Sequence, residues 1–267
     1  MTTGVAPHRP GPAARSELRR GASQLLPPAF LLVAVLLVWE GVVRLLKVSD
    51  FALPAPSAIA AVLIRDQASL AENAWITAQE VLLGFAVSGL VGAALALLIA
   101  RFDRLGRAVY PLVVLFQTVP KIALAPLCIL WFGYGLAPKV VLTVVIAFFP
   151  VALDMLSGLR AVDPNLVALM RSVGSRGGEI LWRVQVPTAL PYLMSGLKIA
   201  VTFSVIGAIV GEFSGAQAGL GYIIQFASTQ LETPLVFAAL VEVSVLGIVF
   251  YYLVELAERL LVPWSPK

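Results

Sequence analysis

Six apolar segments, each long enough to cross a lipid bilayer as a helix, constrain the fold of this chain more than any other feature. They lie at about 28–47, 77–100, 109–131, 138–158, 192–213 and 235–257. The hydrocarbon core of a bilayer, about 30 Å thick, requires roughly 20 predominantly apolar residues in a helix. Charged residues make up only 13% of the 267 residues, whereas soluble domains average about 25%. The sequence therefore predicts an all-α, polytopic membrane helical bundle with about six transmembrane helices.

The distribution of Arg and Lys predicts the orientation of this bundle. With both termini on the cytoplasmic side, 13 of the 19 basic residues face the cytoplasm and four face outward, as the positive-inside rule requires. Residues 1–24 are rich in Pro, Gly, Ala and Arg, which predicts a disordered cytoplasmic tail, and residues 25–264 form the predicted transmembrane domain. The first apolar segment exceeds the 7–15 residues of a signal peptide, so we expect it to be a retained span.

Several classes of function are excluded by composition. The chain has one cysteine, Cys128, and one histidine, His8, which is too few for a Cys/His metal site or a Ser–His or Cys–His nucleophile pair. It also lacks the phosphate-binding pattern GxxxxGK[ST]. We therefore expect no catalytic residues, no metal and no bound cofactor. The net charge of +4 comes from Arg clusters beside apolar segments, which indicates a lipid environment and no nucleic-acid partner.

Small residues recur every four positions in two of the apolar segments. Such stripes allow helices to approach closely where lipid provides no hydrophobic drive for association. We expect close helix–helix contacts there, either within the fold or across a dimer. The two predicted packing stripes are Gly207, Gly211 and Gly215, and Ser88, Gly92 and Ala96.

Ionisable residues within the predicted spans are candidates for a substrate pathway or gate. Lys121 lies in the third segment with Gln117 nearby, and Pro111, Pro120 and Pro126 should kink that segment. The ammonium group could attract an anionic substrate, form an ion pair that stabilises a gate, or extend to the membrane surface. Asp154 and Glu212 are possible partners of Lys121, and Glu212 could instead form a gate or an inter-helix contact.

A long basic loop at residues 160–187 separates the fourth and fifth apolar segments. Asp163 followed by Pro164 is a favourable helix start, and Gly174 can end this helix in a left-handed conformation. The apolar residues of the helix share one face, from which Arg171 points away; they are Leu166, Leu169, Met170 and Val173.

A second short helix is predicted at about 179–186, with Trp182 and Arg183 available to a partner, and Pro187 and Pro191 should stop it. Amphipathicity and charge fit docking of a partner protein and adsorption to the lipid surface equally well.

The loop resembles the docking loop of binding-protein-dependent ABC import permeases. That pattern is Glu-Ala-Ala, three residues, Gly, nine residues, an aliphatic residue, any residue and Leu-Pro. Gly174, Val184 and Pro187 match it and Val186 replaces the Leu, whereas Ala168, Leu169 and Met170 stand at the Glu-Ala-Ala positions, so the acidic residue is missing. Further segments, at 119–141, 147–164, 211–224 and 254–264, resemble the nitrate/sulfonate/taurine branch of these permeases.

The resemblance implies a permease subunit of a type I ABC importer in the cytoplasmic (inner) membrane of a prokaryote. It implies two copies of a separate ATPase subunit docked on residues 160–187, an extracytoplasmic substrate-binding protein, and a permease homodimer. The branch implies a small anion such as a sulfonate, taurine or nitrate as substrate, and near relatives imply a pyrimidine precursor of thiamine as the alternative. A secondary transporter driven by an ion gradient is the competing class, although it would not explain the amphipathic loop.

Overall fold

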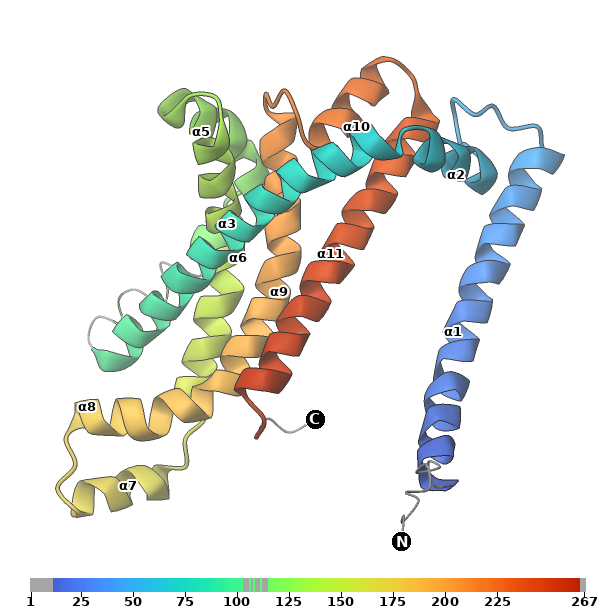
Figure 1. Cartoon of the computed structure of the whole chain (residues 1–267). Helices are drawn as coiled ribbons and strands as arrows, with labels where there is room; N and C mark the ends of the chain where they lie inside the picture. Colours follow the sequence, from blue (N-terminus) through green and yellow to red (C-terminus); the bar gives the residue numbers. More distant parts are fainter. Residues whose placement is uncertain (1–11, 103–105, 107, 109–110, 112–114, 265–267) are drawn as a thin grey trace, which may run out of the picture.

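Four helices of the computed structural model are long and apolar enough to cross a membrane. The structure describes residues 12–102, 106, 108, 111 and 115–264, and in this part of the chain the four are α3 (Gln67–Arg101), α6 (Leu136–Arg160), a continuous helix over Gly177–Phe213, and α11 (Thr233–Leu261). They confirm the all-α membrane bundle (Figure 1). Helix α3 contains the second predicted span and begins ten residues before it, at Gln67, with a partly polar first section.

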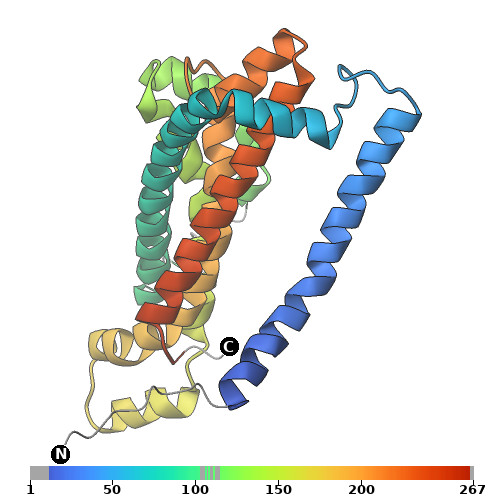
Figure 2. The ribbon, with the colours of Figure 1, turned by 45° about the vertical axis from the view of Figure 1, so that its right-hand side comes forward.

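Helix α1 (Pro12–Leu45) contains the first apolar segment and stands apart from the other long helices in both views (Figures 1 and 2). Residues 12–24, predicted as part of a disordered tail, belong to this helix. Their Ala, Glu, Leu and Arg residues are good helix formers. They continue directly into the apolar segment, so they extend an existing helix and need no separate nucleation step. Residues 1–11 of the predicted tail lie outside the described residues.

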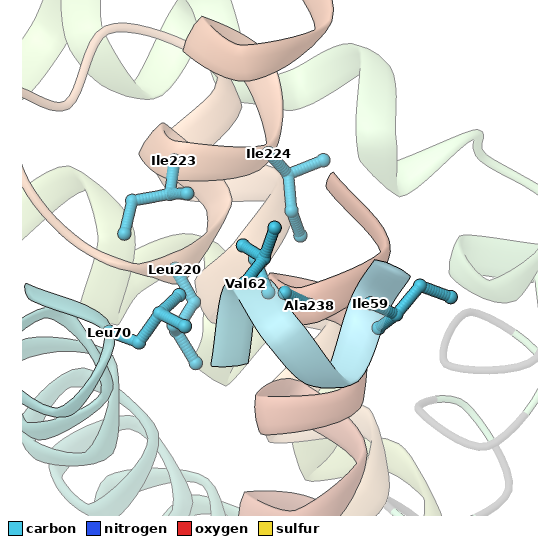
Figure 3. Packing of buried hydrophobic residues seen from close by; sticks show 8 residues of the cluster. Ile59, Val62, Leu70, Leu220, Ile223, Ile224 and Ala238 are labelled. Atoms are coloured by element: carbon cyan, nitrogen blue, oxygen red, sulfur yellow. The ribbon is translucent and has the colours of Figure 1, made fainter. Parts of the chain in front are cut away.

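Short elements cover the outer end of the bundle, opposite the end where α7 and α8 lie. Helix α2 (Pro56–Arg65) packs against α10 (Leu220–Thr229) and the beginnings of α3 and α11. The buried side chains at this contact, shown in Figure 3, include Ile59, Val62, Leu70, Leu220, Ile223, Ile224 and Ala238. The outer helix thus packs on the rim of the bundle and fixes α10 above the membrane-spanning helices.

Helix α6 is the centre of the bundle because glycines bring α3 and α9 (Val186–Phe213) against it. A Cβ atom on Gly92 of α3 would lie 2.6 Å from the Phe148 carbonyl oxygen of α6, and one on Gly207 of α9 would lie 2.7 Å from the Thr143 Cα. Ser88 and Ala96 on α3 are fully buried. The contacts of both stripes therefore lie within one chain.

Gly215 does not belong to its predicted stripe. Helix α9 ends at Phe213, and Gly215 adopts φ +136° in the loop that follows, where it faces the Tyr134 ring. The four-residue spacing of the glycines continues past the end of the helix, and the spacing alone does not show where the helix ends. At this position glycine permits a left-handed turn that a side chain would strain.

The third apolar segment is not one continuous helix in the part that the structure describes. The chain turns at Thr118 and Val119, forms a short 3₁₀-helix over Lys121–Leu124, and continues as α5 (Ala125–Phe132). Pro120, which has no backbone N–H, stands at the break. Of the three prolines predicted to kink this segment, Pro120 stands at the break, whereas Pro126 lies in the first turn of α5.

Candidate functional site

A helical hairpin projects from the cytoplasmic end of the bundle (Figure 1). Its first helix, α7 (Pro164–Ser172), begins as predicted, because the Asp163 carboxylate accepts a hydrogen bond from the Asn165 N–H at 2.8 Å. Gly174 follows the helix with φ +85°, the left-handed conformation expected there. Local capping chemistry therefore fixes both ends of α7.

The two sides of α7 have different surroundings. On the outward side, Leu166, Leu169 and Val173 are 42%, 60% and 70% exposed, and Met170 is half-buried. On the other side, Ala168 and Arg171 line a cavity of about 600 Å³ against the ends of α3 and α6. The predicted apolar face is thus uncovered in the isolated chain, and Arg171 points away from it.

The return from α7 into the membrane is continuous helix. Helix α8 (Gly177–Ile180) passes into a π-helical turn at Leu181–Gln185 and then into α9. The Val186 N–H bonds to the Leu181 carbonyl, five residues back. Trp182 is 63% exposed, whereas Val184 is buried.

The prediction that Pro187 and Pro191 stop this helix was therefore wrong. Pro187 occupies the first turn of α9 and Pro191 lies inside it. Pro187 has no backbone N–H and cannot donate the hydrogen bond that a regular helix requires. The π turn just before it contains one extra residue, and such turns allow a helix to continue although its backbone hydrogen bonds are locally irregular. The Thr188 hydroxyl also bonds to the Val184 carbonyl at 2.8 Å.

At the outer end, Glu212 holds a buried network that joins three helices, α3, α9 and α10. Its carboxylate accepts hydrogen bonds from the Thr77 hydroxyl at 2.6 Å and from the Gly221 N–H. The Thr77 oxygen accepts from the Leu220 N–H at 2.8 Å. A Cβ atom on Gly221 would lie 2.8 Å from the Glu212 carboxylate. Glu212 thus makes an inter-helix contact that fixes the start of α10 to α3 and α9.

A buried ion pair missing from the sequence predictions adjoins this network. Lys139 of α6 donates to Glu80 of α3, with only 12% and 3% of the two side chains exposed. Glu80, Glu212 and Lys139 are close enough to interact electrostatically. Lys139 is one of the four basic residues that the positive-inside rule places on the outer side. The sequence does contain one sign of this cluster of buried polar residues. Thr77 and Glu80 are three residues apart, which places both on one face of α3.

Lys121 has no carboxylate partner among the described residues. Its ammonium group donates to the Gln117 side-chain carbonyl. The suggested partners lie elsewhere: Glu212 is in the outer network, and Asp154 lies at the contact of α6 with Gly196 of α9. Lys198 of α9 pairs with Glu258 of α11 at 2.5 Å.

Comparison with known proteins identifies the group to which these features belong. Residues 88–263 match the family described as "Binding-protein-dependent transport system inner membrane component". The formylaminopyrimidine transport permease protein ThiX of Halalkalibacterium halodurans is 37% identical over 249 residues, which cover 91% of this chain and 98% of the relative. The taurine transport system permease protein TauC of Escherichia coli is 26% identical, with 87% of each chain covered.

A solved structure has the same fold. An inward-facing form of the MetNI methionine ABC transporter aligns with a TM-score of 0.60 at 22% identity, over 75% of this chain and 98% of the other. At this identity the similarity supports the fold alone.

Proposed function

Because the chain belongs to the family of binding-protein-dependent transport system inner membrane components, we propose that it moves a small solute by alternating access, driven by an ATPase docked on α7 and α8. The chain is a multi-pass permease subunit of a type I ABC importer in the inner membrane. Such permeases are transport components and work with ATPase and binding-protein partners. The docking site, the stoichiometry and the solute are our proposals.

The uncovered face of α7 is the observation that carries the docking proposal. Leu166 and Leu169 are exposed although α7 is capped at both ends, and the return segment of the hairpin is anchored to the bundle by the buried Leu181. A rigid helix with an exposed apolar row fits the groove of a partner protein. Two ATPase subunits, one for each permease copy, would cover these rows.

One continuous helix supports coupling between this surface and the outer end. Gly177–Phe213 comprises 37 residues, or about 55 Å at 1.5 Å per residue. It begins in the docking hairpin and carries Glu212 near its other end. Movement of α8 caused by ATP binding would therefore reach the Thr77–Glu212 network, where a loaded binding protein acts on the outer surface.

The transport pathway is proposed to lie between two copies of the chain. Within one copy, α6 is in backbone contact with α3 at Gly92 and with α9 at Gly207. At these contacts there is no room for a solute between α6 and either neighbour. A pathway at the boundary between two permease subunits satisfies this constraint.

For the solute we favour a small pyrimidine, such as a precursor of thiamine. The relative named for formylaminopyrimidine transport aligns over 98% of its length at 37% identity. In addition, Lys139 and Lys198 are neutralised by Glu80 and Glu258. A pathway for an uncharged heterocycle requires no free cation.

A sulfonate or a similar anion is the second candidate, and Lys121 favours it. Its ammonium group has only the neutral Gln117 as a polar partner among the described residues, so no carboxylate of this part of the chain competes with an anionic solute for it. Lys121→Gln should then reduce sulfonate uptake and leave pyrimidine uptake unchanged.

The test is ATP hydrolysis in proteoliposomes containing the permease and its ATPase. A pyrimidine-loaded binding protein should raise the rate, whereas a sulfonate-loaded binding protein should not. The reverse result would select the second candidate. If neither protein has an effect and uptake follows an ion gradient, the ATP-driven proposal is wrong.

Docking is tested by Leu169→Glu, with Ser172→Glu as the matched control. Both positions are exposed on α7, but Ser172 lies off the apolar row. We expect Leu169→Glu to lower co-purification of the ATPase at least about tenfold, as burial of a charge in an interface requires. Equal loss in both variants would indicate a general effect on the hairpin rather than docking on this face.

A further inference from the structure

Two cavities follow one another along the contact between α9 and α11, from the cytoplasmic end toward the middle of the membrane, and together they define a groove. The two helices lie side by side in both views (Figures 1 and 2). At the cytoplasmic end the groove opens into a cavity of about 710 Å³, and farther along the same helices into one of about 500 Å³. The first is lined by polar and aromatic residues and the second mainly by apolar ones.

The first cavity presents both signs of charge. The Lys198 ammonium and the Glu258 carboxylate line it, 23% and 17% exposed, and pair with each other at 2.5 Å. Each group keeps further capacity, because an ammonium has three donors and a carboxylate has about four acceptor positions. Trp264 and Tyr192 lie at the same cavity, as aromatic residues do at membrane interfaces.

The second cavity has the properties of a site for a hydrocarbon chain. Ile206, Ile248 and Tyr251 line it, and Gly247, which has no side chain, lines it as well. A Cβ atom on Gly247 would meet only a Val205 methyl group, at 3.9 Å, so the space beside this glycine is empty of protein.

The length of the groove fits one lipid chain. Glu258 and Gly247 are eleven residues apart on α11, which corresponds to about 16 Å at 1.5 Å per residue. One leaflet contributes half of a hydrocarbon core that is about 30 Å thick. The charged cavity and the apolar cavity are therefore spaced like the head group and the acyl chain of one phospholipid.

We propose that this groove binds one phospholipid of the cytoplasmic leaflet whose head group carries a primary ammonium, as in phosphatidylethanolamine. Its phosphate accepts from Lys198, its ammonium donates to Glu258, and an acyl chain lies over Gly247. The carboxylate selects the head group, because Glu258 offers only acceptors and would repel an anionic lipid. A quaternary ammonium has no N–H to donate, so phosphatidylcholine should bind less tightly.

The test is native mass spectrometry of the full-length chain in detergent with phosphatidylethanolamine, phosphatidylcholine and phosphatidylglycerol of identical acyl chains. We expect one phosphatidylethanolamine per chain, retained roughly tenfold better than the other two, as the additional charge-assisted hydrogen bond implies. Glu258→Gln should bring this ratio close to one. The matched control is Glu255→Gln on the same helix, which disturbs the exposed pair with Arg259 and should leave the ratio unchanged.

A second variant tests the acyl chain independently of the head group. Gly247→Leu fills open space and should reduce retention of all three lipids, whereas Gly41→Leu on α1, also in open space, should not. Equal retention of the three lipids by the wild type would overturn the proposal. So would a Gly247→Leu variant that loses self-association but keeps its lipid, because the groove would then belong to a second copy of the chain.

Discussion

Loss of the Lys139 charge should destabilise the bundle by several kcal/mol, and a second substitution should restore part of that loss. The Lys139–Glu80 pair is almost fully buried between α3 and α6. The second oxygen of Glu80 has no hydrogen-bond partner among the described groups. Lys139→Met therefore leaves a buried carboxylate without compensation, at a cost of about 3–5 kcal/mol.

The double variant separates the pair from simple packing loss. In Lys139→Met/Glu80→Gln the stranded charge is absent, so at least about 1 kcal/mol of the loss should be recovered. The free energy of unfolding can be followed by tryptophan fluorescence in mixed micelles of mild detergent and dodecyl sulfate. Arg259→Met removes an exposed ion pair of α11 and should cost no more than about 0.5 kcal/mol.

Two results would refute this reasoning. If Lys139→Met costs as little as Arg259→Met, the pair is solvated and the buried network does not hold α3 to α6. If the effects of Lys139→Met and Glu80→Gln are simply additive, the two side chains do not interact, and the unfolding cost does not arise from a stranded carboxylate.

Two further predictions concern packing and capping. Gly92→Val should cost about 1–3 kcal/mol, because its new atoms meet the Phe148 carbonyl and overpacked cores lose that much; Gly41→Val, in open space, is the control, and thermal denaturation in detergent measures both. Asp163→Ala should destabilise α7 by about 1 kcal/mol, as loss of an N-cap does. Faster amide hydrogen exchange confined to α7 would verify the second prediction, and unchanged exchange would show that the hairpin does not depend on its cap.

Local rules predicted the features that depend on neighbours in sequence. Asp163 caps α7 and Gly174 ends it because both effects arise within one turn of helix. The close approach of Gly92 to a neighbouring helix followed equally from its spacing. Gly215 was misassigned because spacing does not show where a helix ends.

The remaining features depend on contacts that sequence separation conceals. Glu80 and Lys139 are 59 residues apart, and nothing local indicates that they meet. The continuation of the helix through Pro187 depends on a π turn, which the rule that proline breaks helices does not anticipate. In both cases the tertiary environment decides the outcome.

The position of the π turn gives the long helix of residues 177–213 its mechanical character. One inserted residue rotates the segment before the turn by about 100° relative to the segment after it, compared with a regular α-helix. Within the turn, Trp182 is exposed and Val184 is buried. Beyond the turn, Gly196 and Gly207 bring α9 into contact with the backbone of α6. Sliding of α9 along α6 would force backbone atoms past one another, so a push on α8 is more easily transmitted by rotation of α6 and α9 as one body. We infer that, if an ATPase displaces the hairpin, α6 and α9 move together as one body.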